Sequence, residues 1–283
     1  MKRKRWWLLL LAAVLLGLAL PGFVSSLKTV RYEVAAGGLS QPVRIALVTD
    51  LHACAYGHEQ RKLLDAVEEL APDLILLGGD IFDDKLPDEK AAVFLREISG
   101  EYPCFYVTGN HEYWSGEATF KEKMACLEEY GIRRLCGEAV SVDAGGAAVN
   151  ICGVDDPDAW GSRRGYAEYR DGSFREQLAR AAAQAENGRY TILLTHRPEL
   201  LELYASFGFD LVLAGHAHGG QWRIPGILNG LYAPDQGLSP PYAGGRYERD
   251  GTVMIVSRGL ARESTRVPRF YDRPELVLIE LKP

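Results

Sequence analysis

Five short apolar runs, each followed within three residues by Asp, Asn or His, constrain the fold of this chain more than any other feature. In the clearest, 73–80, four apolar residues stand between Pro72 and a Gly-Gly pair, and Asp80 follows. A short apolar run bounded by such residues predicts a fully buried strand. The other four runs, 43–49, 102–107, 190–194 and 209–214, lead into Asp50-Leu51-His52, Gly109-Asn110-His111, Thr195-His196 and Gly215-His216-Ala217-His218. Because ligands in open α/β sheets lie beyond the carboxyl ends of strands, these side chains predict one common site.

The remaining periodicity predicts a layered α/β fold. Helices are predicted at 59–70, 86–98, 118–130 and 173–185, and further strands at 30–35, 139–142, 147–153, 253–257 and 276–281. Strands alternate with helices early in the chain, and consecutive strands follow later, which is typical of stacked sheets and helices. The 283 residues contain no low-complexity linker. One large domain over 27–283 is therefore expected.

The amino terminus predicts a membrane segment over residues 1–26. Four basic residues, 2–5, precede an unbroken apolar or small run over 6–20, and Pro21 follows. This pattern is typical of an anchor that leaves the rest of the chain outside the cytoplasmic membrane. Small residues at 24–26 also fit a signal-peptidase site, in which case the domain is secreted. A buried core helix is a poor alternative, since such helices seldom lack a polar face.

Charge and cysteine content exclude two classes of protein. The net charge is −6, and without Lys2, Arg3, Lys4 and Arg5 the remaining 28 basic and 38 acidic residues leave −10. An acidic body argues against nucleic-acid binding, and we expect a monomer. Five cysteines without Cys-x-x-Cys spacing do not predict a disulfide framework. Free thiols are favoured over a Cys126–Cys136 bridge.

The polar strand ends predict a metal site. Taken singly, a strand-end Asp or Asn is a turn residue and a lone His is a structural hydrogen-bonding group. That explanation would have to hold at five strand ends, which contain five of the six histidines. Carboxylate and imidazole without thiolate suit Mn²⁺, Fe²⁺ or Zn²⁺. The seven potential ligands suit two ions that share a bridging carboxylate: Asp50, His52, Asp80, Asn110, His196, His216 and His218.

In order, the motifs Asp-x-His, Gly-Asp, Gly-Asn-His-Glu, His and Gly-His-x-His between Asp50 and His218 resemble those of the calcineurin-like metallophosphoesterases. The block Gly-His-Ala-His-Gly-Gly-Gln at 215–221 and the stretches 264–270 and 273–275 are similar to a membrane-associated bacterial phosphodiesterase branch, although Ala261 stands where that branch has Gly. The resemblance implies a four-layer αββα sandwich.

It also implies a division of the ligands. Asp50, His52 and His218 would hold one ion, and Asn110, His196 and His216 would hold the other, with Asp80 bridging both. His111 would orient the phosphate or protonate the leaving oxygen.

The expected activity is hydrolysis of a phosphodiester or pyrophosphate. A membrane segment favours a lipid-linked or cell-envelope substrate, for example of the nucleotide-diphosphate acylglucosamine type. Arg197 and Arg266 are weaker candidates for substrate contact, because surface and salt-bridge roles are equally consistent with their positions. Two alternatives remain: a non-catalytic, metal-stabilised envelope binding protein, and a mononuclear hydrolase of amides or esters.

Overall fold

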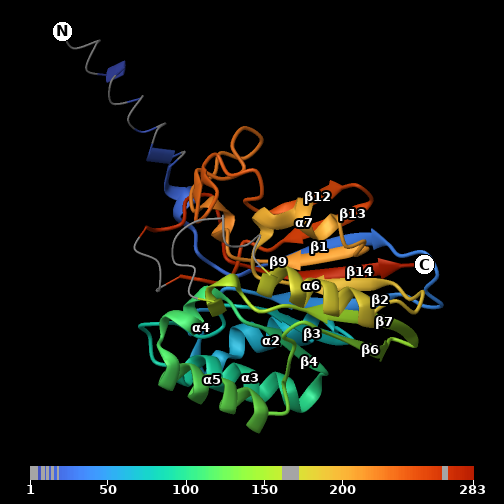
Figure 1. The fold of residues 1–283 in the computed structure, drawn as a ribbon. Coiled ribbons are helices and arrows are strands. Elements are labelled where there is room, and N and C mark those ends of the chain that lie inside the picture. The colour runs from blue at the N-terminus through green and yellow to red at the C-terminus, as the bar shows by residue number, and fades with distance from the viewer. Residues whose placement is uncertain are drawn as a thin grey trace.

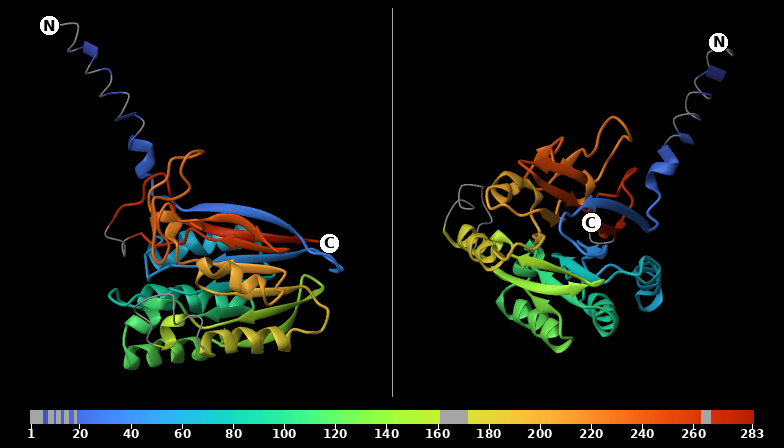
Figure 2. Two further views of the ribbon diagram at one scale, coloured as in Figure 1. Left: turned by 45° about the horizontal axis from the view of Figure 1, so that its top comes forward. Right: turned by 90° about the vertical axis from the view of Figure 1, so that its right-hand side faces the viewer.

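The protein is a sandwich of two six-stranded sheets, seen from three sides in Figures 1 and 2. The computed structural model describes residues 19–160, 172–262 and 267–283, together with Trp6, Trp7, Leu10, Ala13, Leu16 and Gly17. The first sheet has the order β1 (Lys28–Ala35), β14 (Glu275–Lys282), β2 (Val43–Val48), β3 (Leu74–Gly78), β4 (Cys104–Val107) and β5 (Arg133–Arg134). The second has the order β12 (Gly245–Arg249), β13 (Thr252–Val256), β9 (Leu211–Ala214), β8 (Thr191–Leu194), β7 (Ala147–Gly153) and β6 (Glu138–Ala144).

The strands that lead into the predicted ligands are parallel neighbours. In the first sheet β2 pairs with β3 and β3 with β4, and in the second β8 pairs with β9, all parallel. Their carboxyl ends therefore lie at one edge of each sheet. These strands are buried on both faces, which explains why they read as unbroken apolar runs rather than alternating ones.

Helices cover the outer faces of the sandwich. The helices α2 (Arg61–Leu70), α3 (Glu89–Glu101) and α5 (Glu117–Glu129) pack on the first sheet, and α6 (Gly172–Gln184) and α7 (Leu201–Ala205) pack on the second. A short helix α4 (Asn110–Trp114) follows β4, and single-turn 3₁₀ helices lie at η1 (Leu20–Phe23), η2 (His58–Gln60), η3 (Pro157–Trp160), η5 (Pro198–Leu200) and η6 (His218–Gly220). A small hairpin is formed by β10 (Tyr232–Ala233) and β11 (Gly237–Leu238).

Three apolar clusters hold these layers together. The central cluster joins the facing surfaces of the two sheets, with Ile45 and Leu76 from one and Ile192 and Leu213 from the other. The two outer clusters fill the spaces between each sheet and its helices. No described residue before Leu27 belongs to any of the three clusters. The part of the chain from Ser25 onward thus contains both sheets and the whole hydrophobic core.

The layered α/β sandwich predicted from the sequence is confirmed, and most element boundaries agree within a few residues. The sequence patterns did not indicate β12, the two-residue strands β5, β10 and β11, or the short helices α4 and α7. Strand β12 was missed because it is an exposed edge strand with several charged residues, which weakens its apolar signal. All five cysteines are free, in agreement with the favoured interpretation.

Twelve of the 26 residues in the predicted membrane segment over 1–26 lie outside the described residues. Among those that are described, no helix has both the length and the apolar content needed to cross a bilayer. Near the end of the segment, Gly22 is buried against the ring of Phe270, and the Phe23 and Phe270 rings are 5.0 Å apart. The anchor, and with it the proposed division at residue 26, stays a prediction.

Candidate metal centre

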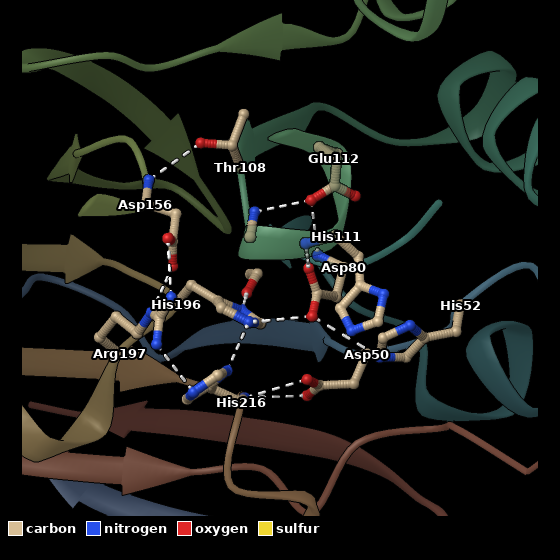
Figure 3. A network of polar contacts seen from close by, with 12 residues as sticks. Asp50, His52, Asp80, Thr108, His111, Glu112, Asp156, His196, Arg197 and His216 are labelled. Atoms are coloured by element: carbon tan, nitrogen blue, oxygen red, sulfur yellow. Dashed lines mark hydrogen bonds and ion pairs between the residues drawn. The ribbon is translucent and has the colours of Figure 1, made fainter. Parts of the chain in front are cut away.

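The polar residues after five strands meet between the two sheets at one end of the sandwich. Figure 3 shows Asp50, His52 and Asp80 from the first sheet facing His196 and His216 from the second. The backbone N–H of His216 donates to both carboxylate oxygens of Asp50, at 3.0 and 3.2 Å. Residues 166 positions apart in the sequence are thus in direct contact across the interface of the sheets.

The backbone at these strand ends adopts an uncommon conformation. Asp50, His52, Asp80, His216 and His218 all have positive φ, between 46° and 63°. For residues other than glycine each such conformation costs roughly 1 kcal/mol or more, and it persists only where the surroundings hold it. Five of the seven predicted ligands share this strain, which is typical of a functional site.

Among the described residues, five groups of three side chains have ligand atoms close enough to bind one ion, and two of these groups consist only of predicted ligands. Asp50, His52 and His218 form the first, and Asp80, His196 and His216 form the second. Within each group the ligand atoms lie within 4.8 Å of one another. Two atoms bound to one ion at about 2.1 Å are roughly 3.0–3.4 Å apart, so only small shifts would be needed.

Asp80 belongs to the second group and also lies close to the first. Its Oδ2 atom is 3.6 Å from His52 Nε2 in the first group and 3.2 Å from His196 Nε2 in the second. Burial alone would raise the pKa of Asp80, but the charges of His196 and His111 hold it well below its usual range. A permanently ionised carboxylate between two sets of imidazoles is placed to bridge two cations.

The side chains present fit divalent ions. Buried atoms without a hydrogen-bond partner include His52 Nε2, Asp80 Oδ2, Asn110 Oδ1 and His218 Nδ1. Buried polar atoms are normally paired, and four of them at predicted ligand positions indicate a missing common partner. Imidazole, amide and carboxylate atoms are the donors that Mn²⁺, Fe²⁺ and Zn²⁺ accept. The structure therefore supports divalent metal ions as cofactors of this site.

The four predicted histidine ligands divide into two with lowered pKa values, His216 and His218, and two with raised pKa values, His52 and His196. Burial and the neighbouring charge of Arg197 lower the pKa of His216 to about 4, and burial lowers that of His218 well below its usual value. Both rings are thus neutral, as metal ligands must be. Burial also disfavours the charge on His196, but the attraction of Asp80 outweighs it and raises the pKa to about 10. The negative charge of Asp80 and Asp50 can be neutralised either by a proton on His196 or by a bound metal ion.

The ring orientations are set by neighbours outside the ligand groups. The Nδ1 atom of His52 donates to Asp83 Oδ2 at 2.9 Å, and that of His196 donates to the carbonyl of Gly78 at 2.8 Å. In both rings Nε2 remains for the ion. In His216 the two ring nitrogens exchange these roles. Its Nε2 lies 2.9 Å from Asp235 Oδ2, and its Nδ1 lies 3.2 Å from His196 Nε2 and remains for the ion. Such outer partners fix the tautomer of each ring and raise its affinity for metal.

Glu112 holds the strand ends of β3 and β4 together. Its fully buried carboxylate accepts hydrogen bonds from the N–H groups of Asp80, Phe82 and Gly109 and from the hydroxyl of Tyr106, at 2.7 to 3.1 Å. Gly109 is also required by space, because a Cβ there would stand 2.2 Å from Asp80 Oδ1. These contacts place the bridging carboxylate against the first turn of α4.

His111 lies at the open side of the site. Its Nδ1 is 2.7 Å from Asp84 Oδ1, its ring centroid is 4.4 Å from that of His52, and its side chain remains 19% exposed. This is the combination expected of a residue that meets a substrate while it stays oriented by a carboxylate.

Comparison with known proteins agrees with this geometry. The model of the calcineurin-like phosphoesterases matches residues 43–220, which include all seven predicted ligands. The chain belongs to this family. Its members among curated proteins include an uncharacterized metallophosphoesterase of Aquifex aeolicus, 29% identical over 263 residues with 90% of this chain and 92% of that protein covered. Another is YkoQ of Bacillus subtilis, 30% identical over 242 residues with coverage of 84% and 83%.

The match to some relatives of the family is partial. Uncharacterized metallophosphoesterases of Helicobacter pylori and Campylobacter jejuni are 28% and 29% identical to this calcineurin-like phosphoesterase over 87% and 88% of its length. The chain spans only about three fifths of those proteins, 61% and 62%. Among solved structures, NAD nucleotidase of Haemophilus influenzae shares the fold, with a TM-score of 0.50, 16% identity, and coverage of 78% of this chain and 46% of that one.

Of the two arginines predicted to contact substrate, the structure describes Arg197 but not Arg266. Arg197 is 2% exposed, and its guanidinium binds Asp156 through Nε and Nη2 and Asp235 through Nη1. In this arrangement it supports the second ligand group from behind, and a substrate role stays a prediction. Arg266 lies outside the described residues.

Several residues of the site had no assigned role in the sequence analysis. Asp83 and Asp84 directly follow the Asp80 turn, so their proximity to it was a usable signal. Asp156 gave no such signal, since its partner Arg197 is 41 positions away. Asp235 lies in a Gly- and Pro-rich loop where nothing in the pattern indicated a contact with His216.

Proposed function

We propose that this protein is a dinuclear metal-dependent hydrolase of a phosphodiester or pyrophosphate. The observation that supports it best is the position of Asp80 Oδ2, 3.6 Å from His52 Nε2 in the first ligand group and 3.2 Å from His196 Nε2, which belongs with Asp80 to the second. When bound, a pair of divalent ions supplies Lewis-acid activation of water and neutralises charge on the phosphoryl oxygens. The physiological metal is left to the assay below.

The chain's own residues would divide the remaining work. Asp84 accepts from Nδ1 of His111, so in the doubly protonated ring Nε2 would be the atom that donates a proton to the leaving oxygen. Trp114, whose ring centroid is 4.7 Å from that of His111, would form one wall of the substrate cleft. A complete His111 position favours substrates with an alkoxide or phosphate leaving group, because these benefit most from protonation.

The substrate we propose is lipid-linked or otherwise part of the cell envelope. The support is the basic and apolar sequence before residue 26, which we interpret as an anchor that holds the domain outside the cytoplasmic membrane. A nucleotide-diphosphate acylglucosamine is one compound of this kind. The alternative of a non-catalytic binding protein is less favoured, since such proteins have no need of an oriented, partly exposed His111.

The test is turnover of bis-para-nitrophenyl phosphate by the metal-stripped protein after addition of Mn²⁺, Fe²⁺ or Zn²⁺. Asp80→Asn and His111→Ala should each lower kcat by at least roughly 100-fold. For His111→Ala, metal stoichiometry should remain two per chain. Full metal binding without turnover of any phosphodiester would support the binding-protein alternative, and a stoichiometry of one would support a mononuclear enzyme.

A further inference from the structure

The exposed apolar side chains of the domain are gathered in one loop, residues 221–242. Six large apolar residues of this loop are more than one-third exposed: Trp222, Ile224, Ile227, Leu231, Tyr232 and Leu238. We call these six the apolar loop surface. Ile227 is 84% exposed and Leu238 76%, values typical of charged residues. Among the described residues from Leu27 onward, three other large apolar side chains are more than one-third exposed: Trp114, Trp160 and Val267.

Charge is nearly absent from the same loop. About a quarter of the chain is charged, so 22 residues would ordinarily contain about five charged side chains. The loop contains two, Arg223 and Asp235. Asp235 is bound to Arg197 and His216, and Arg223 is half-buried. Contiguous apolar exposure without charge marks a surface that meets another apolar phase.

The apolar N-terminal segment leaves the domain beside this loop. The ring of Phe270 contacts Phe23 on one side and Trp222 on the other, with centroid distances of 5.0 and 5.2 Å. The N–H of Tyr271 donates to the carbonyl of Gly22 at 2.6 Å, and the Arg273 guanidinium binds the Ser26 backbone and side chain. In both views of Figure 2 the loop protrudes on the side of the body from which the N-terminal segment emerges.

The hairpin β10–β11 joins this surface to the metal centre. Tyr232 and Leu238 are direct cross-strand partners, so their exposed side chains lie on the same face. At the tip of the hairpin, Asp235 accepts from the Arg197 guanidinium and lies 2.9 Å from His216 Nε2. One end of this seven-residue hairpin therefore touches a predicted metal ligand, and the other end is apolar and exposed.

We propose that the apolar loop surface docks on a lipid bilayer and places the metal centre at the membrane interface. Trp222 and Tyr232 would lie at the level of the headgroups, where aromatic residues with one polar atom are enriched, and Ile227 and Leu238 would enter the acyl region. A bilayer is favoured over a protein partner because the side chains protrude from loops rather than line a groove, and because an apolar chain segment continues from the same place. If the hydrolase proposed above is correct, its substrate is then an amphiphile presented by the bilayer.

The experiment uses residues 25–283, which contain both sheets and all three apolar clusters, so that the N-terminal segment cannot contribute. This protein is mixed with vesicles of phosphatidylethanolamine and phosphatidylglycerol, or of phosphatidylcholine alone, and floated on a density gradient. We expect co-flotation with both, with little effect of added salt because burial of apolar groups is not screened. Ile227→Ser/Leu238→Ser should lower partitioning by roughly 10- to 100-fold. Trp160→Ser, which removes an exposed apolar side chain elsewhere, is the matched control and should float like the parent.

Three outcomes would overturn the proposal: no flotation of the parent, flotation abolished by salt, or equal loss in the Trp160 control. A parent that sediments as a dimer, and becomes a monomer in the double variant, would assign the surface to a second copy of the chain instead. Hydrolysis of soluble bis-para-nitrophenyl phosphate is measured on the same samples and should be equal in the parent and the double variant. Hydrolysis without vesicle binding refutes docking alone, and vesicle binding without hydrolysis refutes the proposed activity alone.

Discussion

The ion pair between Arg197 and Asp156 offers a direct test of how the site is held. Both side chains are almost fully buried, and Nε and Nη2 of Arg197 bind the two carboxylate oxygens at 2.5 and 2.9 Å. Arg197→Met leaves the Asp156 carboxylate buried without this counter-charge, which typically costs about 3–5 kcal/mol. The N–H of Asp158 still donates to Asp156 Oδ1 at 2.9 Å, so we expect a loss of about 3 kcal/mol in the free energy of unfolding.

The measurement is urea unfolding of the metal-stripped protein, followed by far-UV circular dichroism. Addition of Asp156→Asn to Arg197→Met should restore part of the loss, with a coupling energy of roughly 2 kcal/mol, since the unpaired charge is then removed. Arg249→Met is the matched control, because its pairs with Glu202 and Asp250 are on the surface and contribute less than about 1 kcal/mol. An Arg197→Met protein of unchanged stability but with reduced kcat/KM toward a phosphodiester would refute this reasoning and support the substrate role considered from the sequence.

Two further predictions concern metal and pH. Addition of Mn²⁺ at 100 times its dissociation constant should raise the free energy of unfolding by about 2.7 kcal/mol in a thermal-shift assay, and Asp80→Asn should remove most of this gain; no shift would contradict the metal centre. Burial raises the pKa of Glu199 to about 7, so the folded state binds this proton more tightly than the unfolded state, and stability falls as pH rises from about 4.5 to 7. In Glu199→Gln the unfolding free energy should fall less between about pH 5 and pH 8, by roughly 2–3 kcal/mol, and an unchanged urea profile would refute the assignment.

The strands and the potential ligands were predictable because their signals are local. A run such as Leu74–Gly78 is apolar throughout because both faces of β3 are covered, and this holds wherever the strand lies in the sheet. The residue that follows, Asp80, is then placed at the carboxyl edge by chain continuity alone. The same reasoning gave the layered α/β fold and the set of residues with which to search for a site.

The supports of the site were not predictable, because they join distant parts of the chain. Asp83 could be suspected from its place after Asp80, but Asp235 approaches His216 only because the β10–β11 hairpin folds back over the second sheet. Glu112 appeared in the sequence as one letter of a motif, and the hydrogen bonds that it accepts from the N–H groups of Asp80 and Phe82 exist only when β3 and β4 pair. The role of Arg197 likewise depends on Asp156, which a separate strand delivers.

Composition and periodicity thus determined that this chain forms buried parallel strands with Asp, Asn and His at their ends, because the apolar residues of each strand indicate by themselves that the strand is buried. Only the packing of one sheet on the other decided which of those ends meet. Contact between Asp50 and His216 requires β2 and β9 to align across the sandwich, and that alignment results from the interdigitation of the whole inner core rather than from any one segment. The sharing of Asp80 between two ligand groups is a property of that interface and of no single stretch of sequence.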